Sequence, residues 1–202
     1  MIFDFAQIGP RDRHKLLTST IIPRPIAWVS TRSLDGVDNA APFAFFNVFG
    51  EDPPVLALGI HDGANGPSDT GNNIRATGEF IVNLVPRSAL TQMDVTARDF
   101  APEVDEFSEA NLTKLDSIKV KPPRIGESPV AYECKLIHTV ELGPSRWIAV
   151  GQVLIAHIAD EAILDADRFH IASDKLDIVA RIAGGRYAQL TEAFGPWART
   201  SS

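Results

Sequence analysis

Three short segments carry side chains suited to binding an anionic or flat ligand, and the first is Pro23–Thr31, PRPIAWVST. Arg24 lies between two prolines, and the hydroxyl residues Ser30 and Thr31 end the same run. A guanidinium and two hydroxyls are donors suited to an anion. The pattern also fits an edge strand with a solvated arginine, because prolines favour strand edges. The segment predicts a strand and leaves both roles of Arg24 open.

The second segment is NAAPFAFF, which follows the turn signal Asp35-Gly36. Its small side chains would let a flat ligand approach the backbone, and an asparagine amide can both donate and accept hydrogen bonds. The phenylalanines fit a barrel core as well as a stacking surface. The candidate ligand-binding residues here are Asn39, Ala40, Ala41, Pro42 and Phe43.

The third segment is Ser68–Ile74, SDTGNNI, at a predicted helix start. Unpaired N–H groups and the positive end of the helix dipole can receive a phosphate there. Ser68 and Asp69 are also good capping residues, so an ordinary helix cap explains the segment equally well. Thr70 and Asn73 are the better donors to a ligand.

Other kinds of catalytic site find little support. The five histidines are scattered, without a metal-binding spacing, so no metal site is expected. The serine-hydrolase pattern GxSxG and the phosphate loop GxxxxGK[ST] are absent. Cys134, the single cysteine, lies between apolar neighbours and fits a core position. An enzyme built on this chain would take its chemistry from a cofactor.

Composition limits the partners and the location. A formal net charge of -7 and 202 residues in all describe an acidic chain of single-domain size. Such a chain lacks the basic patch that nucleic acid requires, and no apolar run is long enough to cross a membrane. With one cysteine and no apolar signal region at its N-terminus, we expect a cytoplasmic protein.

Short runs of branched and aromatic residues, separated by turn residues, predict strands. They are IIPRPIAWVST, APFAFFNVFG, PVLALGI, EFIVNLV, VAYECKLIHTVEL and RWIAVGQVLIAHIA. Helices are expected from Ser68 to Gly78 and from Ser88 to about Arg98, and the charged segment 98–129 is expected to leave the core. Strands in hairpin order with few helices indicate an antiparallel barrel rather than βαβ units.

The ordered set PRPIAWVST, NAAPFAFF, DPPVLALGI, SDTGNNI and EFIVNLV strongly resembles the flavin-reductase-like FMN-binding split-barrel family, in its flavoredoxin-like branch. The similarity continues through VDEF, KVKPPRIGESPVAYEC, GQVLIAHI and RIAGGRYAQL. It implies one domain over residues 1–202, mainly β with α additions: a six-stranded antiparallel split β-barrel with peripheral helices. It also implies a homodimer with one FMN per subunit.

By this resemblance, Arg24, Ser30 and Thr31 would border the flavin and its ribityl-phosphate tail. Residues 39–43 would lie beneath the isoalloxazine, and Thr70 and Asn73 would meet the phosphate. A nicotinamide or substrate pocket would contain His157, Arg181 and Tyr187. The chain departs from its relatives at Ser68, where they usually carry lysine, and at Ala44, where they commonly carry serine.

The activity that the resemblance implies is hydride transfer from NADH or NADPH to FMN, with electrons passed on to a small molecule or redox protein. Three alternatives are a non-enzymatic FMN carrier, an oxidase of a pyridoxamine-like substrate and a barrel without flavin.

Overall fold

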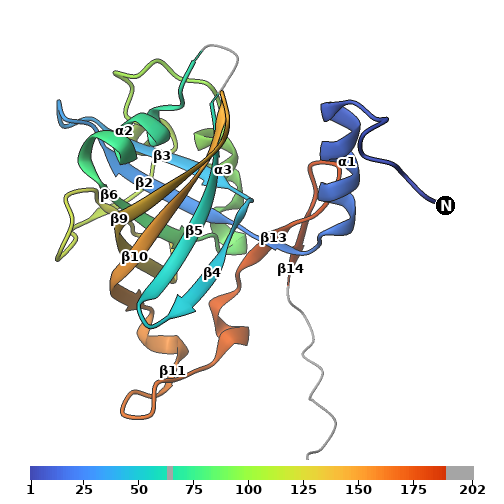
Figure 1. Cartoon of the computed structure of the whole chain (residues 1–202). Coiled ribbons are helices and arrows are strands. Elements are labelled where there is room, and N and C mark those ends of the chain that lie inside the picture. The colour runs from blue at the N-terminus through green and yellow to red at the C-terminus, as the bar shows by residue number, and fades with distance from the viewer. Residues whose placement is uncertain (63–65, 190–202) are drawn as a thin grey trace, which may run out of the picture.

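A computed structural model describes residues 1–62 and 66–189, and its main feature is an antiparallel sheet of seven strands. The strand order is β3-β2-β6-β9-β10-β5-β4, in which three of the six neighbouring pairs, β2–β3, β4–β5 and β9–β10, are hairpins of consecutive strands (Figure 1). Smaller two- and three-stranded sheets and a few helices surround it. The protein is therefore mainly β with few helices, as the sequence predicts.

The strands of the main sheet are β2 Ala27–Arg32, β3 Asp38–Phe43, β4 Phe46–Glu51, β5 Pro54–His61, β6 Glu79–Leu84, β9 Val130–Gly143 and β10 Arg146–Ile158. The short strands are β1 Arg24–Pro25, β7 Lys114–Leu115, β8 Arg124–Ile125, β11 Ile163–Asp165, β12 His170–Ile171, β13 Val179–Arg181 and β14 Tyr187–Gln189. The helices are α1 Pro10–Thr20, α2 Asp69–Thr77, α3 Leu90–Thr96 and α4 Glu106–Glu109, with 3-10 turns at Arg87–Ala89, Asp160–Ala162 and Ser173–Leu176.

The two edge strands β3 and β4 are joined by only two residues, Ala44 and Phe45. Because such a short connection spans only a few ångströms, the sheet must curl until its edges meet at this corner. The Gly59 N–H donates to the Phe45 carbonyl over 2.7 Å, and a Cβ on Gly59 would lie 2.9 Å from the Phe45 Cβ. A glycine at position 59 therefore lets the corner close against β5.

The predicted number of six strands is wrong for the main sheet. The run APFAFFNVFG, expected to be one strand, is divided at Ala44 and Phe45 between two strands at opposite edges. No ladder joins β3 to β4 in the part of the chain that the structure describes, so the curled sheet is open rather than a closed barrel. A break in direction inside an apolar run leaves no signal in the hydrophobic pattern.

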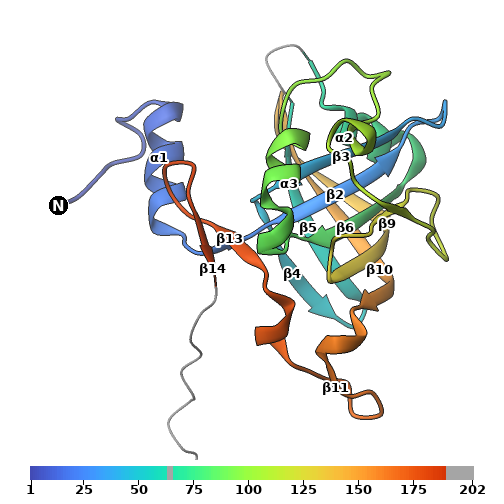
Figure 2. The same ribbon diagram turned by 180° about the vertical axis from the view of Figure 1, so that it is seen from behind.

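Apolar side chains cover both faces of this sheet. The interior of the curl is filled from five strands, β2, β5, β6, β9 and β10, and from α2 by Ala27, Val29, Leu56, Leu58, Ile60, Ile74, Phe80, Val82, Cys134, Trp147 and Ala149. On the other face, α3 and α4 pack over a second cluster around Trp28, Met93 and Phe107, and Figure 2 shows α3 in front of the sheet. The Trp28 indole donates to the Thr96 hydroxyl over 3.0 Å, which ties β2 to α3.

The helix α1 and the β13–β14 hairpin stand beside the sheet (Figures 1 and 2). No residue of α1 is buried. Strand β1 pairs with β13, which anchors the hairpin next to the chain that leaves α1. This helix was not predicted, although Gly9 followed by Pro10 is a usual helix start.

The predicted helix between Ser68 and Gly78 is confirmed. The Ser68 hydroxyl accepts from the Gly71 N–H over 3.2 Å, and Gly78 ends the helix at φ 70°. The second predicted helix is shorter than expected, a 3-10 turn followed by α3. No helix among the described residues is long and apolar enough to cross a membrane.

Gly151 on β10 is a test of core packing. A methyl group there would lie 2.3 Å from Cζ of the fully buried Phe80 ring. We expect Gly151→Ala to lower the free energy of unfolding by about 1–3 kcal/mol, because overpacking forces buried side chains to move. Urea unfolding measures this change. Gly9→Ala, where a Cβ meets nothing within 4 Å, should change stability far less, and equal effects of the two variants would contradict the packing.

Candidate functional site

A network of polar side chains lies at the start of β3, where β2, β3 and α2 meet. Asn39 Oδ1 accepts from the Thr70 hydroxyl over 2.7 Å and from the Thr31 hydroxyl over 3.2 Å. Asn73 Nδ2 donates to the Thr31 oxygen over 3.0 Å. All four side chains are at least nine-tenths buried. Four residues that the sequence singled out from three separate segments therefore form one cluster.

A fifth member of this network, Glu106 of α4, was not predicted as a site residue. The Asn39 amide donates to Glu106 Oε1 over 2.7 Å, while buried Oε2 has no partner among the described residues. Burial raises the pKa of Glu106 to about 7, against the lowering effect of nearby donors. The Asp105 side chain caps α4, and this Asp-Glu pair at a helix start was the available sequence signal.

The network borders a cavity of about 410 Å³ whose charge is negative. Its carboxylates are those of Asp35, Asp69, Glu103 and Glu106, and no lysine or arginine is among the described residues that line it. Burial, together with the charge of Glu103, raises the pKa of Asp69. That Thr70 and Asn73 bind a phosphate stays a prediction. The negative charge of this cavity disfavours the binding of a phosphate dianion there.

Ser30 lies on the other face of β2 from Thr31, because successive side chains of a strand alternate. The Ser30 hydroxyl donates to the Pro123 carbonyl over 2.7 Å and accepts from the Asn83 amide over 3.2 Å. These bonds hold the segment before β9 against the sheet. The side chains of Ser30 and Thr31 therefore do not meet in one site.

A second polar cavity, also of about 410 Å³, lies between the main sheet, α1 and the β13–β14 hairpin. We call it the arginine cavity because Arg24 and Arg181 both line it, together with the predicted site residues Pro42 and Tyr187. Arg24 and Arg181 are directly opposite in the β1–β13 ladder. The structure thus unites residues expected at the flavin with residues expected at the nicotinamide.

The two guanidiniums of the arginine cavity are held by neutral partners. Arg24 Nη1 donates to the carbonyls of Thr18 and Ile21 at the end of α1, over 2.6 and 2.9 Å. Its Nε is buried and has no partner among the described residues. Burial, and next the charge of Arg181, lowers the pKa of Arg24. In the described chain, neither arginine lies within 4.0 Å of a carboxylate oxygen, so neither forms a salt bridge there.

Tyr187 fixes the position of Arg181. Arg181 Nη1 donates to the Tyr187 oxygen and its guanidinium lies 4.6 Å from the centre of the ring. The Tyr187 hydroxyl donates in turn to Asp94 Oδ1 over 2.7 Å. Burial and the bond to Asp94 raise the pKa of Tyr187 to about 12. Asp94 was missed because 93 residues separate it from Tyr187 in the sequence.

His157 is not brought to the arginine cavity. Its Nε2 lies 2.7 Å from Glu133 Oε1, and Glu133 also accepts from the backbone of Ile118 and Lys119. Burial would raise the pKa of Glu133, but these hydrogen bonds lower it overall. The pair holds the loop before β8 on the sheet. Within residues 1–62 and 66–189, no three His, Cys, Asp or Glu side chains are grouped to hold a metal ion.

Residues Ala40, Ala41, Pro42 and Phe43 form the stretch of β3 between the polar network and the arginine cavity. They pair with β2 on one side only, because β3 is an edge strand. Ala40 is buried, while the next three residues are partly exposed. Backbone groups of the partly exposed residues 41–43 on this free edge are available to a ligand, whereas Ala40 is packed in the cluster around Trp28.

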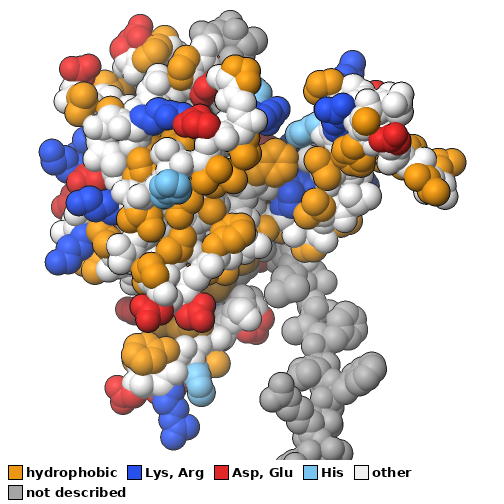
Figure 3. All heavy atoms as spheres, viewed as in Figure 1, with side chains coloured by type: hydrophobic (Ala, Val, Ile, Leu, Met, Phe, Trp, Pro, Cys, Tyr) orange, Lys and Arg blue, Asp and Glu red, His pale blue; other side chains and the backbone are white. Residues whose placement is uncertain are grey.

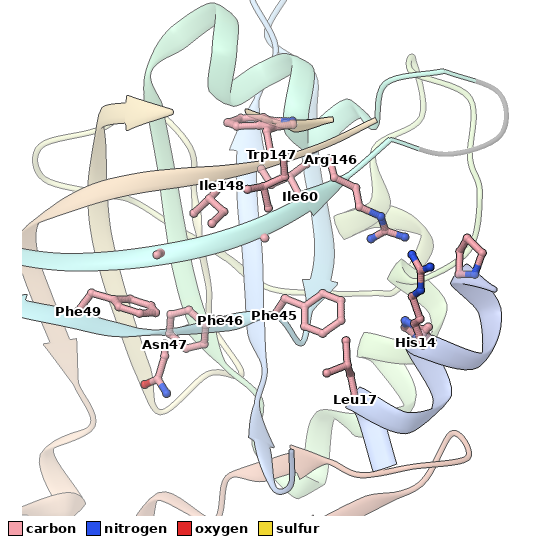
Figure 4. Close-up of a pocket in the computed structure, with 15 residues that line it drawn as sticks. His14, Leu17, Phe45, Phe46, Asn47, Phe49, Ile60, Arg146, Trp147 and Ile148 are labelled. Carbon is pink, nitrogen blue, oxygen red and sulfur yellow. The ribbon is translucent and has the colours of Figure 1, made fainter. Parts of the chain in front are cut away.

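An apolar cavity of about 520 Å³ lies next to the arginine cavity, between α1 and the strands β4, β5 and β10. Figure 4 shows Phe45, Phe46 and Phe49 along one side and Trp147 and Ile60 beyond them, with Leu17 of α1 near Phe45. His14 packs edge-on to Phe45, with ring centres 6.1 Å apart, and both residues line both cavities. Helix α1 therefore forms one wall of two adjacent cavities.

Glu106 predicts a pH dependence of stability. The folded state keeps its proton up to about pH 7, whereas the unfolded chain loses it near 4.5, so ionisation of this group destabilises the fold as pH rises between these values. We expect Glu106→Gln to remove a fall of up to about 3 kcal/mol in the free energy of unfolding between pH 5 and 8. Urea unfolding of both proteins across this range measures the difference.

The matched control is Glu109→Gln, an exposed carboxylate on the same helix. It should leave the pH dependence as in the parent protein. If Glu106→Gln and the parent protein lose stability in parallel as pH rises, Glu106 does not hold a proton in the folded state at neutral pH.

Comparisons with known proteins agree with this architecture. The family described as flavin reductase like domain matches residues 18–172. The uncharacterized protein YwrF of Bacillus subtilis (strain 168) is 36% identical over 197 residues, which cover 96% of each chain.

Two solved structures share the fold over nearly all of the chain. Nitrilotriacetate monooxygenase component B from Bacillus cereus has a TM-score of 0.91 and 30% identity, covering 97% of this chain and 98% of that one. The 2-nitrobenzoate 2-nitroreductase NbaA of Pseudomonas fluorescens has a TM-score of 0.90 and 26% identity, covering 99% and 97%. The match of the family to most of the chain, and of these relatives to almost all of it, shows that this protein belongs to the flavin reductase like domain family.

Proposed function

We propose that this protein is an FMN-dependent oxidoreductase that takes a hydride from NADH or NADPH and passes electrons to an acceptor. The observation that carries the proposal is the free edge of β3, with a small, partly exposed side chain at Ala41, between a buried polar network and two arginines. Family membership supports a flavin, and the names of the two structural relatives, a nitroreductase and a monooxygenase component, support an enzyme.

The residues along β3 fit the ring part of FMN. Ala41 is small and partly exposed, so it permits close approach to the backbone, and Pro42 and Phe43, also partly exposed, provide apolar contact. Backbone groups on the free edge would hydrogen-bond the ring and orient it. When bound, the flavin would supply the hydride and electron chemistry, and the protein would align it with the nicotinamide and exclude water.

The phosphate end fits less well. The start of α2 offers backbone N–H groups and a favourable dipole, but Ser68 supplies no positive charge, and Asp69 and Glu106 lie close by. We therefore expect FMN to exchange more readily than in relatives that carry lysine at this position. An exchangeable FMN would serve a reductase that delivers reduced flavin to a partner.

The proposal includes a cytoplasmic homodimer. Exposed apolar side chains gather over β4 and β9 beside the apolar cavity, including Phe49 and Leu142, which line that cavity and are 71% and 61% exposed (Figure 3). An isolated 11-residue helix such as α1 is marginal in water, and none of its residues is buried. A second copy of the chain against this face would cover both features. The buried free thiol of Cys134 suits a reducing compartment.

The flavin is tested by absorption spectroscopy. We expect the purified protein, loaded with FMN and freed of excess, to retain a flavin band that bleaches anaerobically with NADH or NADPH. A band that neither nucleotide bleaches would favour an electron carrier, and the absence of a band would reject the FMN assignment. Ala41→Leu should abolish retention by blocking the edge of β3, whereas Ala166→Leu, an exposed position in another part of the chain, should not.

The dimer is tested by sedimentation. Phe49→Asp should convert the dimer to a monomer at micromolar concentration, because a charge would be buried in an apolar interface. Leu34→Asp, at a residue that is 79% exposed in the β2–β3 turn, should leave the mass unchanged. A parent protein that sediments as a monomer would contradict this part of the proposal.

A further inference from the structure

The unexplained feature of this structure is a pair of like charges placed side by side. Arg24 and Arg181 are cross-strand partners in the β1–β13 ladder, where like charges destabilise a sheet. Arg24 is only 8% exposed, and its Nε has no hydrogen-bond partner in the described chain. A buried donor without a partner is costly, so a group that accepts from it is expected.

Both arginines line the arginine cavity, and other residues hold each of them in place. Arg24 is held by two carbonyls of α1, and Arg181 by Tyr187, which is itself bonded to Asp94. Each guanidinium therefore has a fixed position before any ligand arrives. Preorganised donors of this kind bind carboxylates and phosphates with directional hydrogen bonds.

The charge of the cavity selects among anions. Two guanidiniums face one carboxylate, that of Asp94, which leaves a single positive charge in excess when His14 is counted as neutral. A monoanion balances this charge, whereas a phosphate monoester carries close to two negative charges at neutral pH.

Apart from His14 and Thr18, the other side chains that line the cavity are apolar. They include Ile26, Pro42, Phe45 and Met93, opposite the polar side chains. A cavity of about 410 Å³ has the size of a small-molecule site. A ligand with an apolar body and one carboxylate would match both the walls and the charge.

We infer that the arginine cavity binds the carboxylate of a small, largely apolar molecule between Arg24 and Arg181. The site itself is independent of flavin, but its assignment as the site of the electron acceptor rests on the proposed function. The cavity adjoins Pro42 at the end of the β3 edge, so an acceptor held there would lie next to the proposed flavin ring.

The test compares a carboxylate with its neutral amide. We expect isothermal titration calorimetry to show that benzoate binds the purified full chain at least about tenfold more tightly than benzamide, because the charge-assisted bonds are lost with the amide. Arg181→Gln should remove most of this preference while leaving benzamide binding unchanged. Arg186→Gln, an exposed arginine of the same hairpin outside the cavity, should keep it.

A second variant guards against misfolding. Arg181→Lys keeps the charge but loses the two-pronged geometry, so benzoate should bind with intermediate affinity. Equal binding of benzoate and benzamide would overturn the inference. So would failure of both benzoate and hexanoate to bind at millimolar concentration, or an equal loss in Arg181→Gln and Arg186→Gln.

Competition with FMN and with riboflavin completes the experiment. If FMN displaces benzoate and riboflavin does not, the arginines hold the flavin phosphate and the inference is overturned. If benzoate binds with the expected preference while no flavin band is retained, the anion site stands and the proposed flavin function fails. If the band is retained and bleaches but no carboxylate binds, only this inference fails.

Discussion

The two-residue connection between β3 and β4 is the constraint on which the rest of the structure depends. Ala44 and Phe45 link strands at opposite edges of a seven-stranded sheet, so the sheet has to curl. Curling creates an interior that Phe80 and Trp147 fill, and it leaves the outer edge of β3 unpaired. The same corner places Phe45 in the walls of two adjacent cavities. Core, edge and cavities are thus consequences of one short turn.

The surroundings of the two ends of β3 carry opposite charges, which the sequence of the strand itself does not show. Near its start, Glu106 and Asp69 make the surroundings of Asn39 negative, while beyond its end Arg24 and Arg181 make the arginine cavity positive. An elongated anionic ligand lying on this edge would be drawn by its charge toward the arginines and away from the carboxylates. The potential along the strand therefore opposes the orientation that the resemblance implies for FMN, in which the phosphate lies near Thr70. Protonation of Glu106 removes one of these negative charges and so weakens the repulsion of a phosphate near Thr70. Because the pKa of Glu106 is about 7, this protonation occurs near neutral pH.

The sequence predicted those features that local physics determines. The strands followed from branched and aromatic runs, and α2 followed from a cap at Ser68 and a stop at Gly78. The resemblance placed Asn39 beneath the flavin ring and Thr70 and Asn73 at the phosphate, so it did not predict that these side chains and Thr31 would bond to one another. The sequence did not predict features that depend on the direction of a side chain or on contacts between residues far apart in the chain.

His157 illustrates this limit, since its contact with Glu133 depends on the register between β9 and β10. The opposite orientations of Ser30 and Thr31 follow from strand alternation alone, yet adjacent hydroxyls suggested a common site.

Arg24 connects the architecture to the proposed chemistry. Its guanidinium satisfies two carbonyls at the end of α1, which the helix cannot satisfy itself, and the same group faces the arginine cavity. Helix α1 has no buried residue, so these bonds, the contact of His14 with Phe45 and the bond from Arg13 to the Phe5 carbonyl are among the few contacts that fix it. Burial, and next the repulsion from Arg181, lowers the pKa of Arg24, and an anion that neutralises both arginines would relieve that repulsion. Relief of that repulsion would favour the β1–β13 pairing. In the proposed site, Arg24 would thus contact both the bound anion and the end of α1.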